Sequence, residues 1–422
     1  MLHLRGRFVG LSPARRGLYL ERLMGEPARF SALVRLFLFG LPVPADEVAV
    51  PLERLCDLDL VRVEDGVAVS RARFAPHAGL LLAAESGDWH EEDAAEDVVP
   101  GLSNAGLTAA ALTPRAPVRR VLDLGTGFGL HALLASRHAK EVVGVDVNPR
   151  ALSFARLNVE LNDIDNVELR EGDLFEPVAG ERFDLVVSNP PFVVGPDRRY
   201  VFRDGGPQFC ARVLRGVRAV LAEGGVAVVM VGWGHGGHDV WRTPRGWVEE
   251  IGCDAAILRF ADLDLLGNGW LHTRDADVAA RWAGALDSAG IARVAYGAVL
   301  LRRRVGGGRV ATIDAVGKDV PACGAQMLRI LANLEWLDAN EQALASARFA
   351  PAGDLELRTS EQLGASSDAP RPTRLALRRG LPLTVEADDA LVAAIRRGSA
   401  EGDPSLTPRL RELLELGFLA GG

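Results

Sequence analysis

The sequence predicts an α/β protein: a parallel sheet with helices on both faces, and a smaller, mainly helical domain at each end. Three observations support this fold class. Short apolar runs alternate with helical patterns across residues 121–302. A glycine-rich turn follows the first of these runs and precedes a helical pattern. On either side the regular alternation is absent, so we expect the flanking segments to form separate domains.

The apolar runs of the central region have the length of buried strands. Five are expected in its first part. Two more follow in its second part, separated by a helix near 275–289. The expected strands are 121–124, 142–146, 167–170, 185–188, 226–231, 255–259 and 294–302. Together they predict a seven-stranded, Rossmann-like sheet within a domain at residues 101–305.

Residues 1–100 carry the pattern of a small N-terminal domain that ends in an acidic linker. Segment 30–39 predicts a buried helix, segment 45–60 one or two further helices, and segment 61–70 a hairpin around Asp65 and Gly66. Helices followed by a small hairpin are typical of a winged-helix domain. Such a domain binds nucleic acid in some proteins and dimerises or covers a substrate pocket in others.

Residues 306–422 are expected to form a C-terminal accessory domain. The pattern predicts a helix near 326–337 and a Ser/Pro-rich loop at 360–374. The final segment, 406–419, resembles segment 52–61, since both combine a leucine-rich helix with a following apolar strand. The resemblance predicts a second winged-helix-like domain.

Composition limits the classes of function. A hydrophobic share of 48% and a charged share of 25% are those of a soluble globular protein. The most apolar stretch, 226–231, is too short to span a membrane, and residues 1–25 lack the apolar core of a signal peptide. We therefore expect a cytoplasmic protein without a membrane partner. The four cysteines form no Cys-x-x-Cys pair, which favours free thiols and argues against a metal framework.

Charge gives no strong indication of a nucleic-acid partner. The formal net charge is −8, which exerts no overall attraction on phosphate. Arginines cluster in residues 1–40, where they would suit contact with RNA. The chain has only two lysines, Lys140 and Lys318, however, so arginine is simply its usual cation. Both interpretations of the arginines stay open.

A glycine-rich motif at 123–129 predicts the binding site of a cofactor. Glycines at this position let the backbone approach a ligand closely, and the following helix offers unpaired N–H groups. The spacing differs from the Gly-x-Gly-x-x-Gly pattern of dinucleotide folds. The preceding carboxylate would also repel a pyrophosphate, whereas it suits a cationic sulfonium that bears an ammonium group. We therefore expect S-adenosyl-L-methionine, contacted by Asp123, Gly125, Thr126, Gly127 and Gly129.

Further acidic residues follow the next two strands. Asp146, at the end of the second strand and followed by Val147, is expected to accept both ribose hydroxyls. Asp173, followed by Leu174, comes after the third strand, where an adenine amino group would lie. Ligands bind at the carboxyl edge of such a sheet, so these residues are assigned to the cofactor site. Thr108, before the first strand, is expected near the methionine moiety.

The catalytic motif is predicted where the fourth strand ends in Asn-Pro-Pro-Phe. The two prolines stop the ladder and stiffen the backbone. The side-chain carbonyl of Asn189 and the backbone carbonyl of Pro190 can accept both hydrogens of a planar NH2 group, and Phe192 offers a stacking face. Asn189 also borders the expected cofactor. No His or Asp that could deprotonate a hydroxyl stands beside this tetrad in the sequence, and no metal is expected.

These motifs carry a specific resemblance. Residues 121–231 resemble the "methyltransferase small" domain in the segments VLDLGTGFG, VGVDVNPRAL, LNVELN, GDLFEP and VVSNPPF. That class I, S-adenosylmethionine-dependent family includes release-factor glutamine methyltransferases and ribosomal-RNA guanine-N2 methyltransferases, and it shares the tetrad with N6-adenine methyltransferases. The whole chain, with its winged-helix-like ends, resembles a group of actinobacterial methyltransferases. The resemblance implies methylation of a nitrogen atom.

Two departures bear on the acceptor that the resemblance implies. Pro207-Gln208-Phe209 stands where glutamine methyltransferases usually have Asp-Gly-Leu. Phe192 replaces the tyrosine of those enzymes, which favours the RNA-methylating branches.

His235 and His238 have side chains that can bind a metal, but no third ligand lies near them in the sequence.

Three functions remain open at this stage. The first is an N-methyltransferase acting on RNA or on a protein side-chain amide. The alternative is a small-molecule methyltransferase of secondary metabolism with an N-terminal dimerisation domain, which the acidic charge favours. The third is a winged-helix regulator that senses a nucleotide-like ligand, against which the intact Asn189 tetrad argues. The sequence leaves the oligomeric state open.

Overall fold

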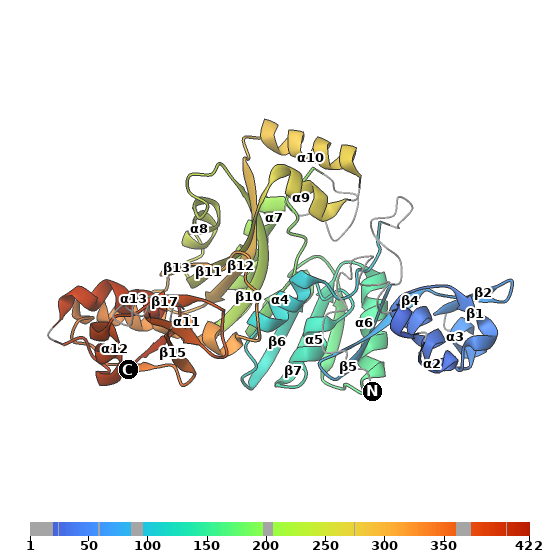
Figure 1. Ribbon diagram of the computed structural model, residues 1–422, viewed down its shortest axis with the longest axis horizontal. Helices are drawn as coiled ribbons and strands as arrows, with labels where there is room; N and C mark the ends of the chain where they lie inside the picture. The colour runs from blue at the N-terminus through green and yellow to red at the C-terminus, as the bar shows by residue number, and fades with distance from the viewer. Residues whose placement is uncertain are drawn as a thin grey trace, which may run out of the picture.

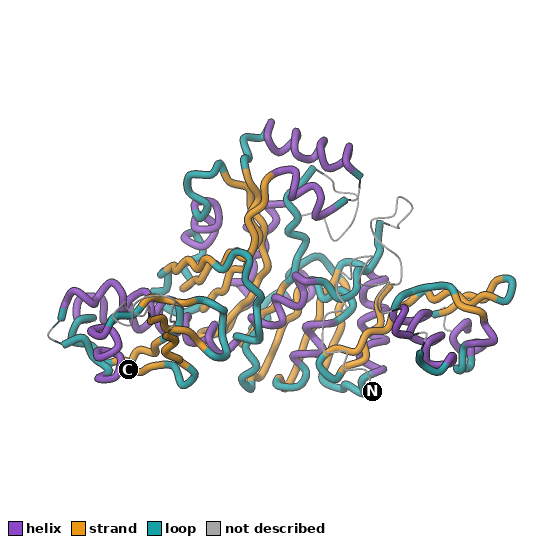
Figure 2. Tube along the Cα trace, in the orientation of Figure 1, coloured by secondary structure: helices purple, strands orange, loops and turns teal. Residues whose placement is uncertain are grey.

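The computed structural model describes residues 20–23, 25–57, 60–85, 96–196, 206–273, 275–359, 373–401 and 403–422. Figure 1 shows the N-terminal and C-terminal elements at opposite ends of the molecule, with a large sheet between them. Figure 2 shows the strands of this sheet side by side, with helices around them. The expected α/β fold class is confirmed.

The large sheet has eight strands in the order β13-β11-β12-β10-β9-β6-β7-β8. Strands β6 to β10 pair in parallel, whereas β12 runs antiparallel to both of its neighbours. The bounds are β6 Val118–Leu124, β7 Ala139–Asp146, β8 Val167–Glu171, β9 Phe183–Ser188, β10 Leu221–His235, β11 Asp254–Asp264, β12 Arg293–Arg302 and β13 Val310–Asp314. The carboxyl ends of the parallel strands form the edge at which ligands bind in this architecture.

The eighth strand is a difference from the predicted seven. The seven expected strands are all present, but β13 pairs in parallel with β11 at the edge of the sheet. Only Ala311 and Ile313 of this strand are buried, whereas Val310 and Thr312 are partly buried and Asp314 is exposed. Its pattern therefore lacks the continuous apolar run that marked the other strands. The sheet extends past residue 305, where the sequence suggested that the central domain ends.

Helices cover both faces of the sheet. On one face lie α7 Gly206–Val220 and α8 Arg242–Glu249, whose Val213, Leu214 and Val248 share a buried core with the strands. On the other face lie α4 Asn104–Leu112, α5 Leu130–Ala135 and α11 Gly324–Asn340. Helix α6 Pro149–Leu161 packs beside α5. Helices α9 Leu265–His272 and α10 Ala276–Ser288 join β11 to β12, above the sheet in Figure 1.

The N-terminal elements have the expected order. Helix α2 Ala28–Leu33 continues into a π-helical turn, and α3 Leu52–Asp57 precedes a three-stranded sheet of order β1-β3-β2. These strands are β1 Val43–Pro44, β2 Val61–Glu64 and β3 Val67–Ser70. Asp65 and Gly66 both have positive φ, as a two-residue hairpin turn of type I′ requires. The winged-helix interpretation of this domain stays a prediction.

A second hairpin, which the sequence analysis did not predict, attaches the N-terminal region to the central one. It consists of β4 Ala72–His77 and β5 Leu80–Glu85. Asn158 of α6 accepts a hydrogen bond from the amide of Ala83 (2.6 Å) and donates one to its carbonyl (2.8 Å). The side chain thus mimics a neighbouring strand, and it fixes β5 to the domain that carries the glycine motif.

The C-terminal region has its own apolar core and two small sheets, β14–β18 and β15-β16-β17. The bounds are β14 Phe349–Pro351, β15 Leu355–Thr359, β16 Thr373–Leu377, β17 Thr384–Glu386, α12 Asp389–Arg397, α13 Thr407–Glu415 and β18 Leu419–Gly421. Helix α13 leads into a strand as α3 does, as the repeated pattern suggested. Most of the loop expected at 360–374 lies outside the described residues.

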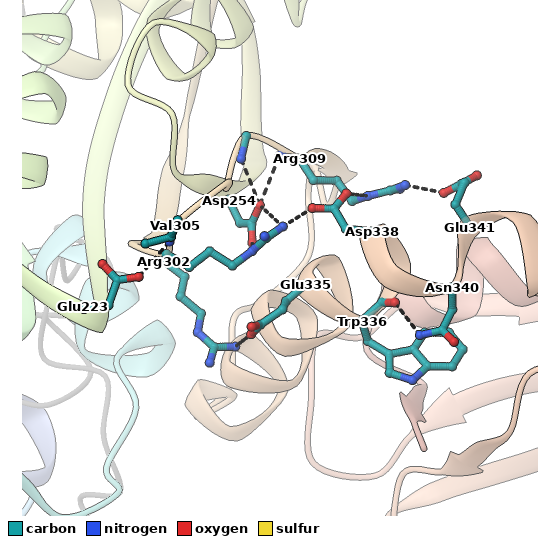
Figure 3. Close-up of polar contacts among 12 residues, drawn as sticks. Glu223, Asp254, Arg302, Val305, Arg309, Glu335, Trp336, Asp338, Asn340 and Glu341 are labelled. Carbon is teal, nitrogen blue, oxygen red and sulfur yellow. Dashed lines mark hydrogen bonds and ion pairs between the residues drawn. The ribbon is translucent and has the colours of Figure 1, made fainter.

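A network of ion pairs joins the sheet to α11 (Figure 3). The carboxylate of Asp254, which is fully buried at the start of β11, is paired with Arg304 and accepts the amides of Gly308 and Arg309, each at 3.1 Å. Arg304 and Arg309 both reach Asp338 of α11. This network ties α11 to the sheet through the buried carboxylate of Asp254 and the more exposed carboxylate of Asp338.

Candidate active site

The glycine motif forms a tight loop between β6 and α5. Gly125, Gly127 and Gly129 have φ of 70°, 56° and 91°, a backbone region that L side chains rarely adopt. A Cβ on Gly129 would lie 2.8 Å from the side chain of Leu133 and 3.3 Å from that of Ala155. The loop also donates two amide hydrogen bonds to the carbonyl of Val145 on β7. The expected cradle is therefore present at the carboxyl edge of the sheet.

Asp123 lies beneath this loop and is fully buried. Its Oδ2 accepts hydrogen bonds from the hydroxyl of Thr126 (2.6 Å) and from the amide of Ala132 (2.9 Å). Its Oδ1 is buried and has no partner among the described residues. Burial raises the pKa of Asp123 to about 7, and the nearby charge of Asp146 adds to this effect. The carboxyl group holds the loop and keeps one unused acceptor atom; its contact with the cofactor stays a prediction.

Asp146 lies directly beside the glycine loop, as the sequence suggested. Its Oδ2 accepts the amide of Gly127 at 2.7 Å, and its Oδ1 accepts the amide of Asn148 at 2.9 Å. Burial raises the pKa of this carboxyl, while the backbone hydrogen bonds act against that rise. Val147, the next residue, is 52% exposed. The carboxylate is thus oriented at the edge of the sheet with its charge partly shielded from water.

Asp173 has a partner that the sequence did not indicate. It is exposed, and its Oδ2 lies 2.6 Å from Nη2 of Arg212 on α7. The guanidinium of Arg212 in turn lies over the ring of Phe209 at 5.7 Å. Leu174 has a positive φ of 48° and packs against the central core. The assignment of Asp173 to adenine stays a prediction, and an adenine amino group would share this carboxylate with Arg212.

Asn189 lies where β9 ends, next to the glycine loop. The preceding Ser188 donates a hydrogen bond to the carbonyl of Leu124 (2.8 Å), which joins the ends of β9 and β6. The Oδ1 of Asn189 is buried and has no hydrogen-bond partner among the described residues. Helix α4 passes close by, since a Cβ on Gly106 would lie 4.0 Å from Nδ2 of Asn189. An acceptor atom is therefore buried without a hydrogen-bond partner in the part of the chain that the structure describes.

Phe192 lies next to Tyr296, a residue that the sequence did not indicate as part of the site. Its ring packs against that of Tyr296 on β12, with centroids 5.8 Å apart and planes at 65°. The hydroxyl of Tyr296 contacts His272 of α9 (3.0 Å). His272 is therefore linked to the Phe192 ring through Tyr296, although it has no neighbour in the tetrad along the sequence. No local pattern marks this neighbourhood, because α9 and β12 follow Phe192 by many residues.

His235 takes part in the sheet. It is buried at the end of β10, its Nδ1 accepts the amide of Gly237 (3.2 Å), and its Nε2 lies 3.4 Å from Asp262. Within the described part of the chain, no group of three metal-ligating side chains comes together. In the same part, no helix is long and apolar enough to cross a membrane. All four cysteines are free.

Comparison with known families places the site within one domain. The model of the methyltransferase small domain matches residues 106–235, and this range includes every residue assigned above to the cofactor and the tetrad. The resemblance predicted from the motifs is thereby confirmed for this part of the chain.

Similar curated proteins include glutamine methyltransferases. The release factor glutamine methyltransferase of Xylella fastidiosa is 35% identical over 185 residues, which cover 39% of this chain and 66% of that protein. The ribosomal protein uL3 glutamine methyltransferase of Bradyrhizobium diazoefficiens is 33% identical over 186 residues, 40% of this chain and 52% of that protein. The chain thus spans less than two thirds of the length of each relative.

Solved structures resemble the fold only distantly. A 16S rRNA N2 G1207 methyltransferase of Thermus thermophilus, solved with AdoMet and guanosine, is 19% identical, with a TM-score of 0.34 and coverage of 63% of this chain and 64% of that one. Trm5b of Pyrococcus abyssi is 13% identical, with a TM-score of 0.37 and coverage of 58% and 62%.

Proposed function

We propose that this chain, whose residues 106–235 form a methyltransferase small domain, is an enzyme that transfers a methyl group from S-adenosylmethionine to a planar nitrogen of RNA or of a protein side-chain amide. The observation that carries the proposal concerns the hydrogen bonding of the Asn189 side chain. Its side-chain carbonyl is buried beside the glycine loop and has no partner among the described residues. Such an atom costs about 1–3 kcal/mol when it stays unsatisfied, and an acceptor NH2 group would satisfy it.

The residues of the loop fit the proposed cofactor. The positive-φ glycines leave the backbone open to close approach, and Asp146 presents an oriented carboxylate at the place where a ribose would lie. The unused, buried Oδ1 of Asp123 suits a cationic ligand better than a pyrophosphate. When bound, the cofactor supplies an electrophilic methyl group on a sulfonium.

The chain's own part in the reaction is to orient the acceptor. Asn189 Oδ1 and the carbonyl of Pro190 accept the two hydrogens of one NH2 group, so its nitrogen lone pair is directed at the methyl group. As the N–C bond forms, the C–S bond breaks and leaves a neutral thioether, and the methylated nitrogen releases one of its two hydrogens as a proton to water. Phe192 stacks on the plane of the acceptor. Positioning and fixed dipoles supply the rate increase in such an in-line transfer, because the acceptor no longer has to search for the productive orientation.

The two acceptor classes have different support. The two similar proteins named above are protein glutamine methyltransferases, which favours a side-chain amide. The net charge of −8 also favours a protein or a small-molecule acceptor over RNA. Phe192, in place of the tyrosine of the glutamine methyltransferases, favours RNA.

The free cysteines fit a cytoplasmic protein.

Radiolabelling tests the proposal and separates the acceptors. The purified protein is incubated with S-adenosylmethionine labelled in its methyl group and with an extract from cells that lack the gene. Portions of the labelled extract are then digested with protease or with ribonuclease, to determine whether the label is in protein, in RNA or in small molecules. We expect label in the protein or the RNA fraction, and none with Asn189→Ala. Label only in small molecules would support the secondary-metabolism alternative. If no fraction takes label although the protein binds the cofactor, the proposal is wrong.

A further inference from the structure

The segment that carries Phe192 lies against the sheet beside Tyr296. Tyr296 is buried and pairs in register with Gly232 of β10. A Cβ on Gly232 would lie 2.4 Å from the carbonyl oxygen of Phe192 and 2.9 Å from the ring of Tyr296. The absence of a side chain at Gly232 therefore lets the segment and the tyrosine ring pack together on this face of the sheet.

A bulge in the adjacent strand lies at the same place. Strand β11 pairs with β12 through Arg259 opposite Gly297 and Ala261 opposite Tyr296, so Phe260 is an extra residue between them. A bulge bends its strand, increases the local twist and changes the direction of neighbouring side chains. The irregularity thus coincides with Tyr296, whose ring packs on that of Phe192.

A chain of hydrogen bonds links Tyr296 to the same segment by a second route. Asn268 of α9 is fully buried, and its Nδ2 donates to the carbonyl of Val194 (2.9 Å). Its Oδ1 is then the acceptor for the hydroxyl of Tyr296 (2.6 Å). Since that hydroxyl donates its only hydrogen to Asn268, the phenol oxygen accepts from Nε2 of His272 (3.0 Å).

A third contact comes from α10. The ring of Trp282 fills the space beside Gly195, where a Cβ would lie 2.4 Å from it. Trp282 also faces His272, with ring centroids 5.6 Å apart. Residues 192–195 are therefore held at Phe192, at the Val194 carbonyl and at Gly195 by groups from β12, α9 and α10. Figure 1 shows α9 and α10 next to each other at this end of the sheet.

We infer that Tyr296 is a positioning residue for the methyl acceptor. Its ring sets the angle of the Phe192 face, and its hydroxyl, through Asn268, holds the backbone of residues 192–195 in place. This inference rests on the proposed function, because that function assigns Phe192 to the acceptor. The cofactor-binding loop and Asp146 lie on other elements and are untouched by this hydrogen-bond chain. Loss of the hydroxyl should therefore weaken acceptor binding selectively.

Tyr296→Phe tests the inference, because it keeps the ring and removes only the hydroxyl. Hydrogen exchange measured by mass spectrometry should show the amides of 192–195 exchanging about five- to tenfold faster, as expected for the loss of a buried hydrogen bond. The Kd of S-adenosylmethionine should change by less than about twofold. For the extract fraction that takes label from the wild type, the KM should rise about five- to tenfold and kcat should change less than KM.

Two further variants separate positioning from general damage. Trp233→Phe removes another buried aromatic hydrogen bond, from Trp233 Nε1 to the carbonyl of Val240 (2.6 Å), on the opposite face of the same sheet. It should leave exchange at 192–195 unchanged. His272→Gln retains a donor for the Tyr296 oxygen, so its exchange and KM should stay closer to the wild type than those of Tyr296→Phe.

The outcomes distinguish this inference from the proposed function. If the wild type labels no acceptor, the proposed function fails, and the exchange measurement still decides whether Tyr296 holds the segment. If exchange at 192–195 is unchanged in Tyr296→Phe, or rises equally in Trp233→Phe, the inference is overturned. A KM equal to that of the wild type in Tyr296→Phe would overturn it as well.

Discussion

Replacement of Asp146 should weaken the affinity for S-adenosylmethionine more than any other substitution that we propose. The carboxylate accepts the amides of Gly127 and Asn148 at 2.7 and 2.9 Å, and each oxygen retains a lone pair for a ribose hydroxyl. In Asp146→Ala both ribose hydrogen bonds are lost. In Asp146→Asn one acceptor oxygen remains, without its charge. The two variants should therefore form a graded series.

The expected loss follows from the strength of such hydrogen bonds. Two bonds to a charged, partly buried acceptor contribute about 2–4 kcal/mol. This corresponds to an increase of the Kd for S-adenosylmethionine by about 30- to 1,000-fold in Asp146→Ala, and Asp146→Asn should lie between this value and the wild type. The protein should stay folded, because the two backbone amides lie at the edge of the sheet where water can replace the carboxylate.

Isothermal titration calorimetry measures the affinity, and circular dichroism checks that the variants are folded. Glu171→Gln is the matched control, since Glu171 pairs with Asp146 in the register of β7 and β8, is exposed, and is not assigned to the ligand. Its Kd should equal that of the wild type. An unchanged affinity in a folded Asp146→Ala protein would refute the assignment of this strand end to the ribose.

Three other residues give further predictions. Asn189→Ala should abolish methyl transfer in the labelling assay yet leave the calorimetric Kd of the cofactor nearly intact; a large loss of affinity would contradict the acceptor role. Asp123 has a raised pKa of about 7 in the folded protein, so the folded state binds the extra proton between about pH 4 and 7 and the free energy of unfolding should fall, by up to about 4 kcal/mol, as pH rises through that window. Urea titrations of the wild type and Asp123→Asn should show this fall in the wild type alone. Asp254→Ala leaves Arg304 without its buried partner and should destabilise the protein by about 3–5 kcal/mol, whereas an unchanged unfolding midpoint would show that the ion-pair network contributes little.

Much of the central fold could be predicted from the sequence, because buried strands produce continuous apolar runs and glycine loops have a fixed spacing. Strand β13 was not predicted, because only alternate residues of it are buried. The β4–β5 hairpin was not predicted for a different reason. Its docking depends on Asn158, which pairs with Ala83 across 75 positions of the chain, and such a long-range contact leaves no local periodicity.

The candidate site shows the same division. Asp146 lies beside the glycine loop as expected, since both follow adjacent parallel strands whose ends must meet at one edge. The ion pair between Asp173 and Arg212 joins residues from different elements, and so does the contact of Tyr296 with Phe192. Neither follows from spacing, because each depends on how a helix or a bulged strand packs on the sheet.

The most direct test of the account is the identity of the methylated atom. The labelled product is digested and analysed by tandem mass spectrometry, with the methyl position assigned from fragment ions. Because Asn189 Oδ1 and the carbonyl of Pro190 together accept the two hydrogens of one NH2 group, we predict a single methyl group on a planar nitrogen. This nitrogen belongs either to a side-chain amide or to an exocyclic base amine. A methyl group on oxygen or carbon would contradict this clamp and the function derived from it.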